Sequence, residues 1–215
     1  MRYIIRFHDK LSDSQQDILN KLSLDIIYQS KFLPLIGVIT DEPEEIRGLD
    51  FVKSIREPAV GSFMEGEFYT TITFEPPLHK SLLVKNQMFG WGDIRVAIID
   101  SGVNSDVSVT ESKDFTGTGN FDVINHGTRI ASIIKHFAKG CNLYSAKIGN
   151  NEPDELNMLK AIEWAVEKGV NIINISSGFK RNCNSDCELC QLISQISKFG
   201  VAVVVAAGNE HNMED

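Results

Sequence analysis

Residues 95–102, with the sequence Arg-Val-Ala-Ile-Ile-Asp-Ser-Gly, decide how this chain folds. The apolar and partly β-branched run at 96–99 is typical of a short strand that is buried on both faces of a sheet. The strand ends at Asp100. In parallel α/β sheets, ligands and catalytic groups gather at the carboxyl ends of strands, because the loops there vary while the strands fix their starting points. We therefore expect Asp100 at a functional edge, although an acidic residue in such a place is more often a cap or a solvated turn residue.

Beyond Asp100 the apolar pattern alternates between helices and strands. Helical spacing covers residues 130–137, 156–166 and 189–196, and short apolar strands follow at 142–146, 171–175 and 201–205. This repetition predicts an α/β fold with a parallel sheet, helices on both of its faces and right-handed crossovers.

The first 60 residues have a different order. Their pattern, β-α-β-β-α-β, fits a small α+β ferredoxin-like unit. Glycines and prolines then punctuate a weakly patterned stretch, which indicates a linker. The predicted organisation is a domain at 1–60, a linker at 61–86 and a second domain at 87–215.

Composition excludes several classes of function. The net charge of -8 and the pI near 5.2 leave no basic face for phosphate groups, so we expect no nucleic-acid partner. No apolar run has the length of a membrane span or of a signal-peptide core, and we expect a cytoplasmic protein with no membrane contact. Four cysteines, three of them clustered, are typical of reduced thiols and not of a secreted disulfide framework.

Three further stretches carry polar groups that suit one chemistry. His126 lies in the sequence Asn-His-Gly-Thr at a helix start, from which we expect its imidazole to project instead of packing into the core. Residues 174–178, Asn-Ile-Ser-Ser-Gly, form a strand end of small residues. Asn209 follows an apolar strand that we expect to be wholly buried, at the same sheet edge as Asp100. An Asp that orients a His base, together with an amide that donates to an oxyanion, suits acyl transfer.

These stretches resemble the subtilisin-like serine proteases over about residues 88–211. Asp100 matches that family's Asp-(Ser/Thr)-Gly block, His126 its His-Gly-Thr block and Asn209 its Ala-Ala-Gly-Asn oxyanion block. The strand 174–178 is similar to the one that holds the substrate backbone. On this strand the resemblance implies substrate-binding residues Ser176, Ser177 and Gly178. It also implies a peptide or protein substrate and no cofactor, and the first domain resembles, more weakly, the family's propeptide, which chaperones the protease and blocks its cleft.

Two departures from the family's pattern matter. Arg129 stands where the family usually has a second histidine. The family's serine lies about 150 to 160 residues beyond the His, whereas 89 residues follow His126 and no Gly-Thr-Ser-Met-Ala block is present. The expectation is therefore an endopeptidase module that is inactive alone or completed by a second polypeptide. The alternative is a non-catalytic peptide-binding or inhibitory module.

The absence of the serine-bearing segment also leads to an expectation about the surface of the second domain. The family's sheet is partly covered by the region beyond the oxyanion block. The strand 201–205 and the helix face of 130–137 are then expected to present an exposed apolar surface or to bind a partner chain.

Cys183, Cys187 and Cys190 are the remaining candidates for chemistry. Their C-x3-C-x2-C spacing suits a metal or a cluster, but Cys141, the only other cysteine, is far away in the sequence. We therefore expect free or redox-sensitive thiols and no metal, and keep the three as metal-site candidates.

Overall fold

The computed structural model describes residues 1–63, 93–180 and 183–206. The first part of the chain forms a four-stranded antiparallel sheet in the order β2-β3-β1-β4, with the predicted β-α-β-β-α-β sequence of elements. These elements are β1 (Arg2–Phe7), α1 (Asp13–Leu19), β2 (Asp25–Gln29), β3 (Leu35–Ile39), α2 (Pro43–Arg47) and β4 (Val52–Arg56). Local signals start both helices: a capping box formed by Ser12 and Gln15 precedes α1, and Pro43 opens α2.

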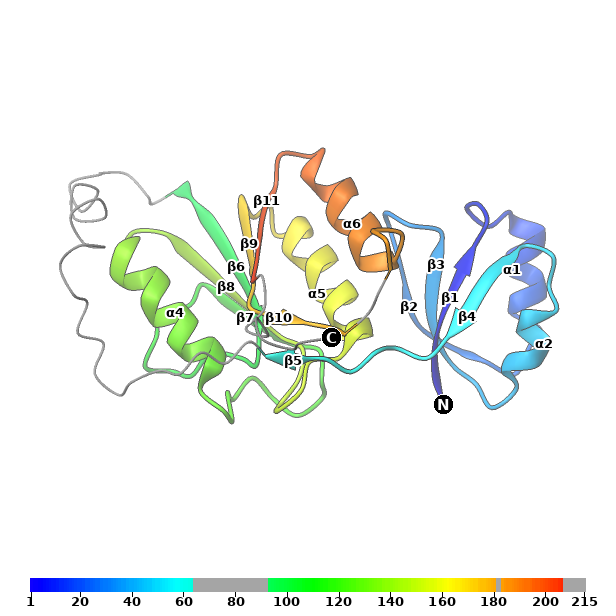
Figure 1. Cartoon of the computed structure of the whole chain (residues 1–215), viewed down its shortest axis with the longest axis horizontal. Coiled ribbons are helices and arrows are strands. Elements are labelled where there is room, and N and C mark those ends of the chain that lie inside the picture. Colours follow the sequence, from blue (N-terminus) through cyan, green and yellow to red (C-terminus); the bar gives the residue numbers. More distant parts are fainter. Residues whose placement is uncertain (64–92, 181–182, 207–215) are drawn as a thin grey trace, which may run out of the picture.

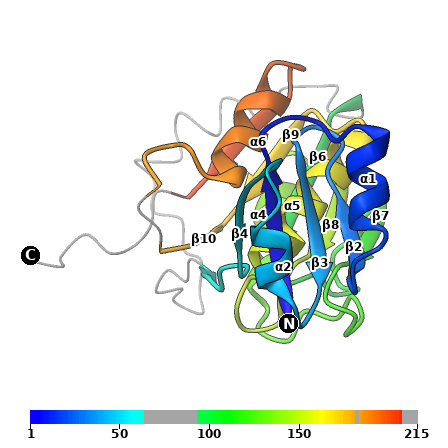
Figure 2. The ribbon, with the colours of Figure 1, turned by 90° about the vertical axis from the view of Figure 1, so that its right-hand side faces the viewer.

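Both faces of this sheet are covered. On β1, Ile5 and Phe7 face the helices α1 and α2, which lie on the outer side of the sheet (Figure 2). Ile4 points the opposite way, into the cluster that contains Leu156 of the helix α5 (Glu155–Glu167). The antiparallel sheet therefore lies between its own helices and α5 (Figure 1).

The second sheet is parallel and has the order β11-β9-β6-β8-β7. Its remaining elements are β6 (Arg95–Asp100), β7 (Glu111–Asp114), α4 (His126–Phe137), β8 (Asn142–Lys147), β9 (Ile172–Ile175), α6 (Glu188–Ser197) and β11 (Ala202–Val205). The strand β7, a short polar strand at the sheet edge, was not predicted from the sequence. Apart from β7, the strands and helices agree with the predicted parallel α/β fold.

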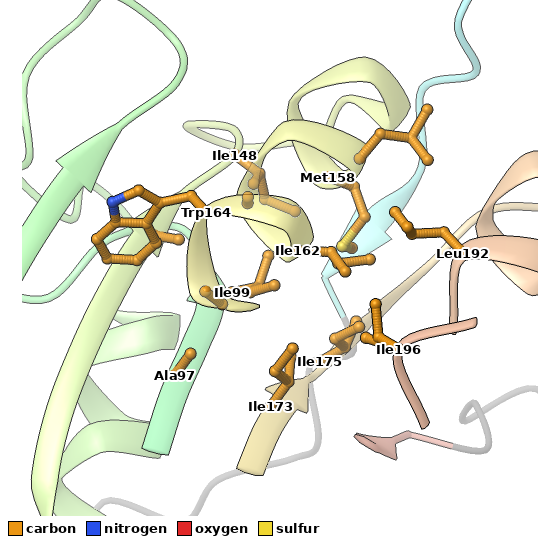
Figure 3. Packing of buried hydrophobic residues seen from close by; sticks show 14 of the residues in the cluster. Ala97, Ile99, Ile148, Met158, Ile162, Trp164, Ile173, Ile175, Leu192 and Ile196 are labelled. Atoms are coloured by element: carbon orange, nitrogen blue, oxygen red, sulfur yellow. The ribbon is translucent and has the colours of Figure 1, made fainter. Parts of the chain in front are cut away.

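The strand β6 shows why this sheet is covered on both faces. Successive side chains of a strand point to opposite sides. Val96 and Ile98 pack with Ala131 of α4, while Ala97 and Ile99 belong to the cluster formed with α5 and α6. Figure 3 shows this second cluster, in which side chains of β6 and β9 meet those of α5 and α6. The wholly apolar run that precedes Asp100 is thus explained by burial on both sides.

A third pairing joins the two halves of the chain. The strand β5 (Ser62–Phe63) runs antiparallel to β10 (Ser177–Gly178). Residues 61–63 are the beginning of the predicted linker, and its remainder, 64–86, lies outside the described residues. The predicted domain boundaries stay a prediction.

One strand of the parallel sheet is poorly covered. Val204 and Val205 of β11 are 55% and 50% exposed, so the expectation of a wholly buried strand is wrong. The predicted exposed apolar surface is confirmed here, whereas on α4 Ala131 is buried and Ile130, Ile133, Ile134 and Phe137 are half-buried. Within the described residues, no helix combines the length and the apolar character needed to cross a membrane. The cytoplasmic location stays a prediction.

Candidate active site

The structure brings Asp100 and His126 into direct contact. Asp100 is the last residue of β6 and His126 the first of α4, and both are 1% exposed. The Nδ1 atom of His126 lies 2.7 Å from Oδ1 of Asp100. In a neutral imidazole this contact holds the proton on Nδ1 and leaves the lone pair on Nε2, the atom that acts as a general base in acyl transfer.

The Asp100 carboxylate is desolvated and well anchored. Burial raises the pKa of Asp100 above its ordinary value, and hydrogen bonds from His126 and Ser101 oppose this effect. Ser101 donates from its backbone N–H at 2.7 Å, and its hydroxyl oxygen lies 3.1 Å from the same carboxylate oxygen. A buried carboxylate fixed in this way can orient the imidazole and stabilise the imidazolium that forms when His126 takes up a proton.

Two glycines permit the close approach of α4 to the end of β6. A Cβ atom on Gly127 would lie 2.2 Å from the carbonyl oxygen of Gly102 and 3.0 Å from Cβ of Asp100. Gly102 itself has a φ of 109°, in the region that favours glycine. The glycines of the Asp-Ser-Gly and His-Gly-Thr blocks are therefore required by the contact between Asp100 and His126.

Asp122 fixes the start of α4, a role that the sequence analysis missed. Its carboxylate accepts hydrogen bonds from the Ser101 hydroxyl at 2.7 Å, the Thr128 hydroxyl at 2.6 Å and the Thr128 backbone N–H at 2.8 Å. A carboxylate near a helix N-terminus is favoured by the helix dipole. Asp122 is 1% exposed and thus links the β6 end to the α4 start inside the protein. An acidic residue shortly before a helix is the sequence signal that could have found it.

The His126 ring is covered by a residue of the N-terminal half of the chain. The centroid of the Phe63 ring lies 5.6 Å from that of His126, with the rings tilted by 34°. The expectation that the imidazole projects away from the core is therefore wrong. The sequence offered no signal for Phe63, because its position depends on the pairing of β5 with β10.

Residues of the predicted substrate strand lie at this pairing. Ser177 is opposite Phe63 and Gly178 is opposite Ser62 in an antiparallel register. Ser176 precedes them, and its hydroxyl accepts a hydrogen bond of 3.0 Å from the Asn174 side chain. An extended segment of the chain itself therefore occupies the edge that the sequence analysis assigned to a peptide.

Ion pairs hold the antiparallel sheet against the start of α5. Arg56 of β4 donates two hydrogen bonds to Glu155, at 2.8 and 2.9 Å, and also pairs with Glu188 of α6. Arg2 of β1 pairs with Asp154, the N-cap residue of α5, at 2.7 Å. Because the chain runs from β4 directly to β5, these contacts position the segment that covers His126.

An apolar cavity of about 180 Å³ lies next to β10. Its lining comes from β9, β10, α5, α6 and the residues before α6, and includes Met158, Ile162, Ser177, Phe179 and Ile193. The three clustered cysteines also line it.

The three thiols of this cluster do not have equal acidity. Hydrogen bonds from the Cys187 thiol and from backbone N–H groups lower the pKa of Cys183. Burial and the neighbouring sulfurs raise the pKa of Cys190 to about 12. Cys141 is buried elsewhere, between β6, β8 and α4.

Asn209, the predicted oxyanion donor, lies outside the described residues. The described part of the site therefore consists of the Asp100–His126 pair, the residues that anchor it and the β10 strand. This arrangement can take a proton from a group near His126 and align an extended peptide along β10.

Comparison with known proteins identifies relatives of this chain. A profile described as the Subtilase family matches residues 92–215. Subtilisin DY of Bacillus licheniformis is 28% identical over 155 residues, which cover 65% of this chain and 56% of that protein. Subtilisin E of Bacillus subtilis strain 168 is 22% identical over an alignment of 232 residues, which covers 97% of this chain and 59% of that protein.

The fold has solved counterparts. The epidermin leader peptide processing serine protease of Staphylococcus aureus superimposes with a TM-score of 0.69 at 21% identity, covering 97% of this chain and 61% of that one. Fervidolysin of Fervidobacterium pennivorans gives a TM-score of 0.64 at 15% identity, covering 97% of this chain and 40% of that one. The chain thus spans less than two thirds of the length of each of these four relatives.

Proposed function

Because the chain belongs to the subtilase family, we propose that it is a serine endopeptidase module in which Asp100 orients His126 and His126 acts as general base and acid. The observation that carries this proposal is the buried contact of 2.7 Å between His126 Nδ1 and Asp100 Oδ1 at the carboxyl end of a parallel strand. The relatives' serine-protease chemistry requires such a pair.

The proposed reaction is hydrolysis of a peptide bond. His126 Nε2 takes the proton of a serine hydroxyl while that oxygen attacks the scissile carbonyl, and the imidazolium then gives the proton to the leaving amine. Asp100 keeps its negative charge and stabilises the imidazolium. Asn209 is proposed to donate its amide hydrogen to the oxyanion.

The nucleophile must come from outside these 215 residues. Ser176 and Ser177 belong to the proposed substrate strand, and Ser177 is 3% exposed. A serine on a further segment, in the same polypeptide or in a second one, would complete the triad. Without it, only the small rate that comes from binding and from the oxyanion hole remains.

We further propose that the N-terminal unit acts as a propeptide that blocks the cleft. Ser62 and Phe63 already lie along β10 as an antiparallel strand, and Phe63 covers the His126 ring. Displacement of this segment would expose both β10 and the imidazole to a substrate peptide in the same extended conformation.

A fluorophosphonate probe, which reacts with activated serines, tests the proposal. The DNA that follows the Asp215 codon is sequenced first. If it encodes a serine-bearing segment, that segment is fused to the chain, and if it does not, the corresponding segment of subtilisin E is fused instead. We expect labelling of the fusion and none of the 215-residue chain. His126→Ala and Asp100→Asn in the fusion should slow labelling by about 10⁴-fold. A folded fusion that labels equally fast with and without His126 would overturn the proposal.

The pairing of β5 with β10 also favours a second function, a non-catalytic peptide-binding or inhibitory module. This strand edge accepts an extended segment without any nucleophile. In this case a Phe63→Ala variant of the 215-residue chain should bind a fluorescent extended peptide with affinity that is unchanged by His126→Ala. Loss of that binding in a Gly178→Pro variant would place the peptide on β10.

A further inference from the structure

Three thiols converge at the start of α6, on a wall of the cavity next to β10. Cys187 is the N-cap residue of α6, Cys190 follows in its first turn and Cys183 lies in the preceding loop. The Sγ atom of Cys190 is 3.3 Å from that of Cys187 and 3.7 Å from that of Cys183, and all three sulfurs lie within 4.8 Å of one another. All three residues are half-buried and therefore reachable from solvent.

The local backbone gathers these sulfurs. Residues three apart on a helix lie on the same face, which places Cys187 next to Cys190. Asn184 and Ser185 both have left-handed φ values, of 44° and 63°, and a hydrogen bond of 2.8 Å from the Asp186 N–H to the Cys183 carbonyl closes the turn. Such conformations are costly for most residues other than glycine and asparagine, so Ser185 is the less favourable of the two positions. The turn brings Cys183 back over the helix start.

The separations fit one cation bound by thiolates. Zinc lies about 2.3 Å from a cysteine sulfur, so two sulfurs on one ion are at most about 4.6 Å apart, and about 3.8 Å apart at a tetrahedral angle. The two separations, 3.7 and 3.3 Å, lie near or below the tetrahedral value. The shorter separation, 3.3 Å, must widen by about 0.5 Å to reach that value. We propose that Cys183, Cys187 and Cys190 bind one Zn²⁺ ion.

The ion would keep one coordination position for a ligand from solvent. Among the described residues, the cysteine group contains no fourth cysteine, histidine or carboxylate. Three thiolates carry more negative charge than the ion carries positive charge, which favours a neutral water as the fourth ligand. The site is separate from the Asp100–His126 pair and does not depend on the proposed peptidase activity.

The loop that would hold the ion also contacts the N-terminal antiparallel sheet. Arg6 of the antiparallel sheet donates a hydrogen bond of 3.0 Å to the carbonyl oxygen of Asp186, which lies between two of the cysteines. Glu188, the residue after Cys187, pairs with Arg56. An ion that fixes this loop therefore fixes the surface of α6 on which the N-terminal sheet docks.

Cobalt provides a direct probe of the site. The reduced, metal-free 215-residue chain is titrated anaerobically with Co²⁺. We expect a thiolate-to-cobalt charge-transfer band that saturates at one equivalent and is abolished by one equivalent of Zn²⁺. Zinc at 100 times its dissociation constant should raise the Tm by about 5 to 10 °C, because it binds only the folded site.

Single substitutions assign the ligands. Cys183→Ser and Cys187→Ser should each abolish the band, whereas Cys141→Ser, a matched control at a remote buried thiol, should retain it. Cys183 lies outside α6, so its variant keeps the helix intact, and circular dichroism checks this. A band that survives Cys183→Ser, absence of a band in a folded reduced chain, or metal uptake as an iron–sulfur chromophore would overturn the proposal. So would a disulfide among the three thiols that forms in the presence of Zn²⁺.

Discussion

Replacement of Arg56 by methionine tests how the N-terminal sheet is held on the rest of the protein. The Arg56 side chain is 23% exposed, and the side chains of its partners Glu155 and Glu188 are 1% and 6% exposed. Its two hydrogen bonds to Glu155, at 2.8 and 2.9 Å, form a bidentate pair. Methionine preserves much of the apolar stem but removes the positive charge from between two buried carboxylates.

The expected cost is large for a single residue. Removal of one partner from a buried ion pair costs about 3 to 5 kcal/mol, because the remaining charge stays in a medium that solvates it poorly. Arg56 retains some solvent contact, which places the expected loss of unfolding free energy at about 3 kcal/mol. Glu155 keeps the hydrogen bond of 2.8 Å that it accepts from the Ala59 N–H. That bond limits the loss but does not replace the charge.

Urea unfolding followed by far-UV circular dichroism and by tryptophan fluorescence, to which the buried Trp164 contributes, measures the effect. Arg47→Met is the matched control, because Arg47 and Glu44 form an exposed pair with side chains 56% and 78% exposed. Such a pair contributes about 0.3 to 0.5 kcal/mol. A single transition with an unchanged slope is needed to convert midpoints into free energies.

A compensating variant separates charge burial from lost packing. Replacing Glu155 and Glu188 by glutamine in the Arg56→Met background removes the two buried charges while keeping side chains of similar size. This triple variant should recover more than half of the lost stability. The reasoning is refuted if Arg56→Met costs no more than the Arg47 control, or if the triple variant is no more stable than Arg56→Met.

Two further predictions concern residues at the ends of elements of the parallel sheet domain. Gly127→Ala should lower the unfolding free energy by about 1 to 3 kcal/mol, because the new Cβ atom would lie 2.2 Å from the Gly102 carbonyl oxygen. Urea denaturation measures this loss, and an unchanged midpoint would contradict the close approach of the two segments. Burial raises the pKa of Asp114, but hydrogen bonds from Thr116 and from the Gly119 N–H outweigh this effect and hold the pKa below its ordinary value. The Asp114 contribution to stability is therefore fully present above the ordinary, unfolded-state pKa of an aspartate and is lost as the pH falls through the lower, folded-state pKa. The stability difference between the wild type and Asp114→Asn should shrink over that acid range, and a difference that stays constant with pH would argue against this role.

The sequence predicted those features that arise from local patterns. The four apolar residues before Asp100 indicated a strand covered on both sides, and the packing of Val96 and Ile98 against one layer and Ala97 and Ile99 against the other follows from strand geometry. The helix start at His126 was likewise local. Asp100 at the end of a strand and His126 at the start of a helix were then expected to meet at one edge of the sheet.

Only the tertiary structure decided what covers and supports this site. Phe63 lies over His126 because β5 pairs with a strand more than 100 residues later. Asp122 links the start of α4 to the end of β6 because its carboxylate also accepts a hydrogen bond from Ser101, which precedes it by 21 residues. The Cys183 sulfur reaches the Cys190 sulfur only because two residues between them adopt left-handed conformations. Periodicity and composition report how each segment divides its side chains between core and solvent. They carry no information about which distant segment packs against a given buried surface. That pairing depends on the packing and the charge interactions of the whole chain.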